Sequence, residues 1–283
     1  MIFDNRPCEL GEGPLWHPER RQLFWFDIPG KKLLSGNTEA ATAWEMPEIA
    51  SAAGWINQSV VMIASETALW RFNLDTQDLS TIAPLEADNP KNRSNDGRAD
   101  PQGGFWIGTM SKTKEKGAGA IYRYYRGEVR ELFSGITIPN AICFPPGGKS
   151  AHFTDTTSGQ VMRVALDTQG WPVGLPQVYL DLTAEGLNPD GAVIDAAGLM
   201  WLAEWGAARV AAYAPDGSFV RAVTFDAPHT SCPAFGGHDL TTLYCTSALQ
   251  GMDKTARAAH PHAGMTFHQP NVAQGQPEHQ VIL

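Results

Sequence analysis

The fold is decided by a pattern in Glu12-Gly-Pro-Leu-Trp-His-Pro-Glu-Arg20 that recurs three times. A polar residue opens a short run of small or apolar residues, a turn follows, and a second apolar run comes next. The other three copies are Asn95-Asp-Gly-Arg-Ala-Asp-Pro-Gln-Gly103, Asn140-Ala-Ile-Cys-Phe-Pro-Pro-Gly-Gly148 and Asp190-Gly-Ala-Val-Ile-Asp-Ala-Ala-Gly198. The alternation in these runs is typical of β-strands and not of helices.

Two weaker copies begin at Ser51 and Ser231, which brings the number of openings to six. The openings are separated by roughly 39 to 50 residues, the length of a four-stranded propeller blade. Third and fourth strands follow at the expected places, as in Ala120-Ile-Tyr-Arg-Tyr-Tyr125 and Val129-Arg-Glu-Leu-Phe133. The sequence therefore predicts an all-β fold, a six-bladed β-propeller in which residues 1–283 form one domain. We expect Ile2-Phe3 or Val281-Ile282-Leu283 to supply the closing outer strand.

Two of the turns are predicted from their chemistry. Asp100-Pro-Gln-Gly103 and Asp195-Ala-Ala-Gly198 begin with a side chain that can bind nearby backbone N–H groups and end with glycine, which tolerates positive φ. Both are the tight connection expected between the first two strands of a blade.

The composition excludes several classes of protein. Hydrophobic residues make up 43% and charged residues 18% of the 283 residues, as in a folded domain. The net charge of −9, with 21 basic against 30 acidic residues, argues against a nucleic-acid partner. No run of about 18 apolar residues predicts a membrane span, and we expect a cytoplasmic protein. The four cysteines lack metal or redox spacing and are expected to be buried free thiols.

The opening residue of each blade is expected to line the central channel. This places oxygen-bearing side chains around one axis, joined by Asp96 beside one of them: Glu12, Ser51, Asn95, Asn140, Asp190 and Ser231. Carboxylates that converge in a narrow channel must share a proton or a cation. Such ligands suit Ca²⁺, Mg²⁺ or Mn²⁺, with Zn²⁺ and Fe²⁺ as further candidates. The alternative is that they only hydrogen-bond strand ends around a water-filled channel.

Other chemically interesting residues are assigned structural roles. The tryptophans in the middle of strands, Trp25, Trp70, Trp106 and Trp201, are expected to pack blades together. No pair of histidines has the spacing of a helical metal site, and no Gly-x-Ser-x-Gly elbow indicates a serine hydrolase. The last repeat carries an insertion from Gln250 to His262, expected to be a loop whose Asp253, His260 and His262 could reach the channel mouth.

The sequence resembles the family of regucalcin (senescence marker protein), gluconolactonases and related sugar lactonases along essentially its whole length. The motifs that carry the resemblance form a linked series: Leu10-Gly-Glu-Gly-Pro-Leu-Trp16, Arg93-Ser-Asn-Asp-Gly-Arg-Ala-Asp-Pro-Gln-Gly103, Gly108-Thr-Met110, Ile138-Pro-Asn-Ala141, Asn188-Pro-Asp-Gly191 and Cys232-Pro-Ala-Phe-Gly-Gly237. Each motif alone is weak, but the series is specific.

The resemblance implies a propeller with one catalytic divalent cation. Its ligands would be Glu12, Asn140 and Asp190, with Asn95 beside the metal or the substrate. Arg93 matches a position that contacts substrate hydroxyls. An acidic substrate contact of the family falls on Glu115, in the lysine-rich loop from Ser111 to Gly117.

We therefore expect metal-assisted hydrolysis of an aldonolactone to the aldonic acid, a step of sugar catabolism. The cation would polarise the carbonyl, Asp190 would be the general base, and Arg93 and Asn95 would hold ring hydroxyls. One alternative is a non-catalytic calcium-binding regulatory propeller, and another is a metal-dependent esterase of different specificity. The partner expected is a small sugar lactone, and the chain is expected to be a monomer or a weak homo-oligomer. The sugar and the metal are not determined by the sequence.

Overall fold

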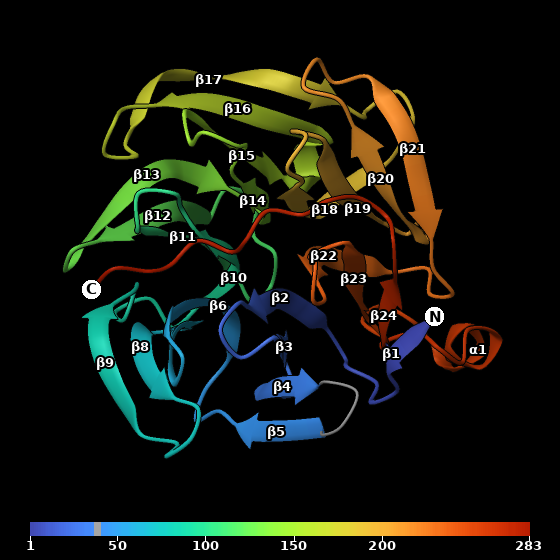
Figure 1. The fold of residues 1–283 in the computed structure, drawn as a ribbon, viewed down its shortest axis with the longest axis horizontal. Coiled ribbons are helices and arrows are strands. Elements are labelled where there is room, and N and C mark those ends of the chain that lie inside the picture. Colours follow the sequence, from blue (N-terminus) through green and yellow to red (C-terminus); the bar gives the residue numbers. More distant parts are fainter. Residues whose placement is uncertain (37–40) are drawn as a thin grey trace.

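The computed structural model describes residues 1–36 and 41–283. Within these residues the chain forms six four-stranded antiparallel sheets around a central axis (Figure 1). This confirms the predicted six-bladed β-propeller. Each of the six predicted opening residues lies in the first strand of its blade, and these strands contact one another around the axis.

The blades follow one another along the chain, and the first strand of each is innermost. The first two blades contain β2 (Gly11–His17), β3 (Gln22–Asp27), β4 (Lys32–Gly36) and β5 (Ala41–Glu45), then β6 (Ala50–Asn57), β7 (Val60–Ser65), β8 (Ala68–Asn73) and β9 (Leu79–Pro84). The next two contain β10 (Asn92–Ala99), β11 (Phe105–Ser111), β12 (Gly119–Tyr125) and β13 (Glu128–Ile136), then β14 (Pro139–Cys143), β15 (Ser150–Asp155), β16 (Gln160–Leu166) and β17 (Pro172–Asp181). The last two contain β18 (Asn188–Ile194), β19 (Met200–Trp205), β20 (Arg209–Tyr213) and β21 (Phe219–Thr224), then β22 (Thr230–Gly236), β23 (Thr242–Ser247), β24 (Thr266–Gln269) and β1 (Ile2–Asp4).

The ring is closed by the N-terminal strand. β1 pairs antiparallel with β24, with Ile2 opposite Phe267, and forms the outer edge of the sixth blade. Of the two alternatives predicted, Ile2-Phe3 is confirmed and Val281–Leu283 is wrong. Both the start and the end of the repeat array therefore lie in one sheet.

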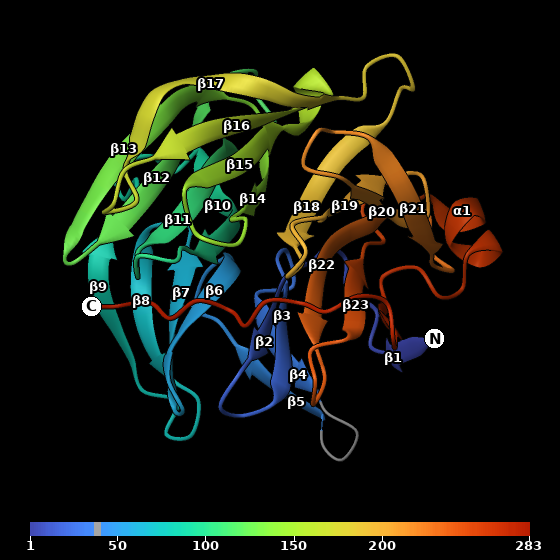
Figure 2. The ribbon, with the colours of Figure 1, turned by 45° about the horizontal axis from the view of Figure 1, so that its top comes forward.

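The C-terminal segment has a different place. From β24 it runs across the ring to the edges of the second and third blades (Figures 1 and 2). The Val281 N–H donates to the Trp55 carbonyl oxygen and the Ile282 N–H to that of Gly103, both at 2.9 Å. We call residues 274–283 the C-terminal strap. It contacts the ends of inner strands that lie opposite the opening residues.

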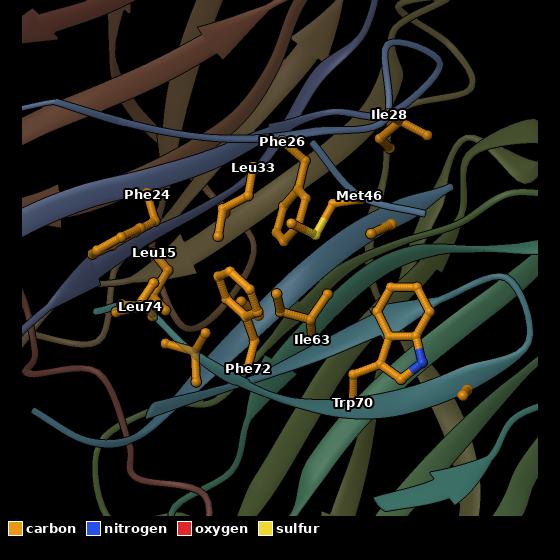
Figure 3. Close-up of a cluster of buried hydrophobic side chains, with 14 of the residues drawn as sticks. Leu15, Phe24, Phe26, Ile28, Leu33, Met46, Ile63, Trp70, Phe72 and Leu74 are labelled. Atoms are coloured by element: carbon orange, nitrogen blue, oxygen red, sulfur yellow. The ribbon is translucent and has the colours of Figure 1, made fainter. Parts of the chain in front are cut away.

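Apolar side chains fill the spaces between neighbouring blades. Figure 3 shows one such cluster, in which Phe24 and Leu33 of the first blade meet Ile63 and Phe72 of the second. The four mid-strand tryptophans are buried, which confirms their predicted packing role. The four cysteines are buried and unpaired, as expected. No helix in the described parts of the chain is both long and apolar enough to cross a membrane.

Both predicted aspartate turns are present. Asp100 Oδ1 accepts hydrogen bonds from the N–H groups of Gln102 and Gly104, each at 2.9 Å. Asp195 Oδ1 binds the N–H groups two and four residues further on in the same way. The fourth residue of each turn is a glycine with φ near +90°. The side chain thus satisfies backbone donors that the reversal leaves without strand partners.

An irregularity in every inner strand positions the channel-facing residues. The pairing register of the first two strands shifts next to the opening residue in all six blades. A β-bulge bends its strand and re-aims the side chain beside it. Gly13 and Ala141, each directly after an opening residue, have φ of 57° and 53°. At Gly13 a Cβ would lie 2.2 Å from the Ser51 carbonyl oxygen, so only glycine fits.

Candidate active site

A cavity of about 270 Å³ lies at the end of the ring where the inner strands begin. Its volume is near the lower end of the range typical of small-molecule sites, roughly 300–1,000 Å³. One part of its wall is polar and the other is apolar. It is lined by Leu10, Glu12, Arg93, Asn95, Met110, Lys114, Ile138, Asn140, Thr156, Thr157, Asn188, Asp190, Trp205 and Gln250.

Two carboxyl groups face this cavity from different blades. Glu12 on β2 is 6% exposed and Asp190 on β18 is 5% exposed. Burial, together with the charge of Asp96, raises the pKa of Glu12 to about 8. Burial and the charges of Glu12 and Asp96 raise the pKa of Asp190 well above its ordinary value. The two negative charges therefore oppose each other in a place from which water is largely removed.

A chain of hydrogen bonds holds the amide groups between these carboxylates. Arg93 Nη1 donates to Asn95 Oδ1 at 2.8 Å, and Asn95 Nδ2 donates to Asn140 Oδ1 at 3.0 Å. Asn140 Nδ2 in turn donates to Thr156 Oγ1 at 2.8 Å. The Thr156 hydroxyl donates to the Pro189 carbonyl oxygen, directly before Asp190. The chain links the third, fourth and fifth blades and fixes which atom of each amide faces which neighbour.

The chemistry of this donor set fits a divalent cation. Two buried carboxylates with raised pKa values and one amide oxygen are hard ligands, and a shared cation relieves their repulsion. Among the described residues no group of three or more His, Cys, Asp or Glu side chains is arranged to hold a metal. A site here would need Asn140 as the third protein ligand beside Glu12 and Asp190.

The predicted ring of six residues divides into two groups. Glu12, Asn95, Asn140 and Asp190 line the cavity, as expected. The two serines are not among the lining residues: Ser51 Oγ donates to Ser94 Oγ at 2.7 Å, and Ser231 Oγ donates to the Gly11 carbonyl oxygen at 2.5 Å. They join neighbouring blades. Since a hydroxyl is short, it reaches the adjacent strand and not the axis.

Asp96 also lies outside the cavity lining. Its Oδ2 accepts a hydrogen bond from the Ile142 N–H at 2.8 Å. Burial raises the pKa of Asp96 to about 6. It is a buried negative charge near the two cavity carboxylates and tightens the requirement for a compensating cation.

Of the two charged residues assigned to substrate contacts, Arg93 lines the cavity and Glu115 does not. Arg93 is 9% exposed and lines the cavity, and burial lowers its pKa to about 10. Glu115 is exposed and is not among the lining residues; its neighbour Lys114 is. The backbone between the two strands is irregular at this point, since Lys114 adopts φ of 59°, in the left-handed region.

The predicted loop after Gln250 is partly helical. α1 spans Lys254–Ala259, and Asp253 Oδ1 caps it by accepting from the Ala256 N–H at 2.8 Å. Gln250 lines the cavity, whereas Asp253, His260 and His262 do not. His262 Nδ1 instead lies 2.7 Å from Asp226 Oδ2.

Sequence reasoning missed several lining residues. In their blades, Met110 is the last residue but one of the second strand, Trp205 is the last, and Thr156 directly follows it. Since second strands run antiparallel to the inner ones, they end where the inner ones begin. The ends of the second strands, which the repeat locates, could therefore have been used to predict these lining residues. Trp205 also stacks on the His229 ring with centroids 4.3 Å apart.

Known proteins resemble this chain over most of its length. A protein of Rhizobium meliloti with the provisional name sugar lactone lactonase is 45% identical over 92% of this chain and 89% of its own. The L-arabinolactonase of Azospirillum brasilense is 33% identical over 94% of this chain and 90% of its own. The crystal structure of a calcium-binding protein, regucalcin, from Agrobacterium tumefaciens matches with a TM-score of 0.98 and 39% identity, covering 100% of this chain and 97% of that one.

The family assignment follows from these matches and from a match to the sequence model of a protein family. The model described as SMP-30/Gluconolactonase/LRE-like region matches residues 10–249, which hold nearly all of the six blades and every cavity-lining residue but Gln250. The chain therefore belongs to the SMP-30/gluconolactonase/LRE-like family.

Proposed function

We propose that this chain, an enzyme of the sugar lactonase type, opens an aldonolactone to the aldonic acid with the help of one divalent cation. The observation that carries the proposal is the meeting of Glu12, Asn140 and Asp190 in one cavity that also presents Arg93 and Asn95. When bound, the cation supplies a Lewis acid that polarises the lactone carbonyl. Calcium, zinc, magnesium, manganese and iron(II) all suit this donor set to some degree.

In the proposed reaction Asp190 transfers the proton. Hydrolysis joins the oxygen of water to the carbonyl carbon and breaks the bond from that carbon to the ring oxygen, which gains a proton. A carboxylate oxygen of Asp190 accepts the proton of the attacking water and returns it to the leaving ring oxygen. Burial and the nearby charges of Glu12 and Asp96 raise the pKa of this carboxyl group well above its ordinary value.

The remaining lining residues hold the sugar. Within residues 1–36 and 41–283, Arg93 donates its hydrogen bonds through Nη1, to the Ser94 carbonyl oxygen and to Asn95 Oδ1. Its Nε and Nη2 are then available for substrate hydroxyls. Leu10, Met110, Ile138 and Trp205 form the apolar part of the wall. A sugar ring has C–H faces and hydroxyl edges, and this division of the cavity suits both.

The proposal is tested by activity with controlled metal content. Purified protein is stripped with a chelator, reloaded with single metals and assayed with a pH indicator on xylono-, arabinono-, galactono- and gluconolactone, with spontaneous opening subtracted. Stripping should abolish turnover and reloading restore it. Asp190→Asn should reduce kcat by at least about 100-fold, whereas Asp181→Asn, an exposed aspartate on β17, should not. Full activity of Asp190→Asn would remove that residue from the mechanism.

A second candidate function is favoured by the structural match. The Agrobacterium protein, with a TM-score of 0.98, is named as calcium-binding. A non-catalytic calcium-binding propeller would bind metal through the same residues without accelerating any lactone. Calorimetric binding of Ca²⁺ with no rate gain across the panel would select this candidate over the first.

The same features suggest where and in what form the enzyme works. Four buried, unpaired cysteines favour a reducing compartment such as the cytoplasm. Every residue assigned a role comes from one chain, so a monomer or a weak homo-oligomer can carry the whole reaction.

A further inference from the structure

Lys114 occupies an unusual position at the cavity. It lies in the connection between β11 and β12 and lines the cavity wall. Its φ of 59° falls in the left-handed region, which a lysine rarely adopts, and its N–H donates to the Ser111 carbonyl oxygen at 2.9 Å. A strained residue at a site needs an explanation, because substitution by glycine would remove the strain without altering the turn.

The partners of the loop lysines differ. Lys112 forms an ion pair with Glu66, and its Nζ also donates to the Pro90 carbonyl oxygen at 3.0 Å. Lys114 has no such ion pair or side-chain hydrogen bond within residues 1–36 and 41–283, although Glu115 is next to it in the sequence. Lys114 is an exposed residue at the edge of the cavity, and its charge acts on the carboxylate of Asp190.

The charges of the lining residues define what the cavity attracts. Glu12 and Asp190 are balanced in number by Arg93 and Lys114. The charge of Arg93 acts on Glu12 and that of Lys114 on Asp190, but only Arg93 is also held by hydrogen bonds, to Ser94 and Asn95, within the described residues. With a divalent cation between the carboxylates, the lining becomes net positive. This local charge stands in a chain whose net charge is −9.

We propose that the natural lactone carries an anionic group remote from its ester, and that Lys114 binds this group and so determines specificity. The inference rests on the proposed lactonase function and narrows its substrate class to acidic lactones. The shared chemistry is a carboxylate or a phosphate on the sugar carbon farthest from the lactone carbonyl. A lysine ammonium is a suitable point charge for either.

The experiment compares lactones that differ only in this group. D-Glucaro-1,4-lactone is paired with D-glucono-1,4-lactone for the carboxylate, and 6-phospho-D-glucono-1,5-lactone is paired with D-glucono-1,5-lactone for the phosphate. The readout is the ratio of kcat/KM within each pair, which cancels differences in active fraction. We expect a ratio above one in the pair that has the natural anion. Added NaCl up to about 0.5 M should lower that ratio, because salt screens exposed charges.

Substitutions in the loop test whether Lys114 causes the preference for the anionic lactone. Lys114→Gln should lower the preferred ratio about tenfold, the usual effect of one charge-assisted contact, and Lys114→Glu should invert it. Lys116→Gln, an exposed lysine of the same loop outside the cavity lining, should leave it unchanged. The inference is overturned if the parent favours the neutral lactone in both pairs, or if the Lys114 and Lys116 variants change the ratio equally. If the parent opens none of the four lactones, the proposed function itself fails.

Discussion

The C-terminal strap should be a main source of stability, and one ion pair provides a test. Arg98 Nη1 at the end of β10 lies 2.5 Å from Glu278 Oε1, and the two side chains are only 11% and 7% exposed. The strap is also held by Trp55 Nε1, which donates to the Glu278 carbonyl oxygen at 2.8 Å. Val281 is buried between the second and third blades. Removing either charge leaves the other buried without its ion-pair partner.

The expected magnitude follows from the burial. Breaking a buried pair by removing one partner costs about 3–5 kcal/mol, whereas replacing both charges by apolar groups is nearly neutral. Arg98→Met and Glu278→Met should each lower the free energy of unfolding by that amount. In a chain of this size this corresponds to roughly 5–8 °C in Tm. The double variant Arg98→Met/Glu278→Met should recover most of the loss.

Urea unfolding followed by tryptophan fluorescence measures this double-mutant cycle, with Glu128→Met, an exposed member of an ion pair on β13, as the control. A coupling energy of at least about 2 kcal/mol is expected. The reasoning is refuted if the two single losses add in the double variant, or if each single loss is no larger than that of the control, about 0–1 kcal/mol for an exposed pair.

Three further predictions concern the site and the blades. Thr156→Val should weaken divalent-metal affinity about 10-fold or more, because Asn140 loses the hydrogen-bond acceptor that orients it as a ligand. Thr156→Ser should keep the affinity of the parent. Equal metal affinities of the parent and Thr156→Val in a chelator competition would contradict this prediction. Asp100→Ala should cost about 3–5 kcal/mol in urea unfolding, since it strands Arg123 in a fully buried pair; a loss below about 1 kcal/mol would be inconsistent with that burial. Burial lowers the pKa of His152 to about 3. Unfolded chains bind this proton below about pH 6.5 and the folded protein does not until about pH 3. The free energy of unfolding therefore decreases as the pH is lowered through that window, by up to about 1.4 kcal/mol per pH unit. His152→Phe should flatten this dependence in thermal unfolding measured from pH 7 to 4, and an unchanged slope would exclude His152 as its source.

Much of the fold could be predicted because the sequence pattern of one blade recurs six times. Opening residues, turns and second strands recur in one register, so an error in one blade would have conflicted with the other five. Residues such as Asn140 and Asp190 were found at the mouth for the same reason. The two aspartate turns could be predicted from local sequence, because each aspartate side chain binds only backbone N–H groups within four residues of it.

Features outside the repeat could not be predicted in this way. The strap has no periodic pattern, and its contacts depend on which faces of distant blades are left open. Lys114 lines the cavity and Glu115 does not, in an irregular loop where Lys114 has a positive φ that no sequence spacing encodes. Ser51 and Ser231 occupy the predicted positions, but the length of their side chains, and not their place in the repeat, decides what they reach.

The bulges explain why the site is where the blades are least regular. In an unbroken inner strand, alternate side chains would face the two neighbouring blades and none would point along the channel. A shift of register beside Glu12, Asn140 and Asp190 turns these side chains out of that alternation. The residue after each must then tolerate crowding or a left-handed backbone. Gly13 and Gly191 can, the latter lying where a Cβ would be 2.3 Å from Cys232 Sγ. Ala141, at φ of 53°, is accordingly the strained position in this set, and an Ala141→Gly variant should retain the arrangement that a larger side chain there would lose.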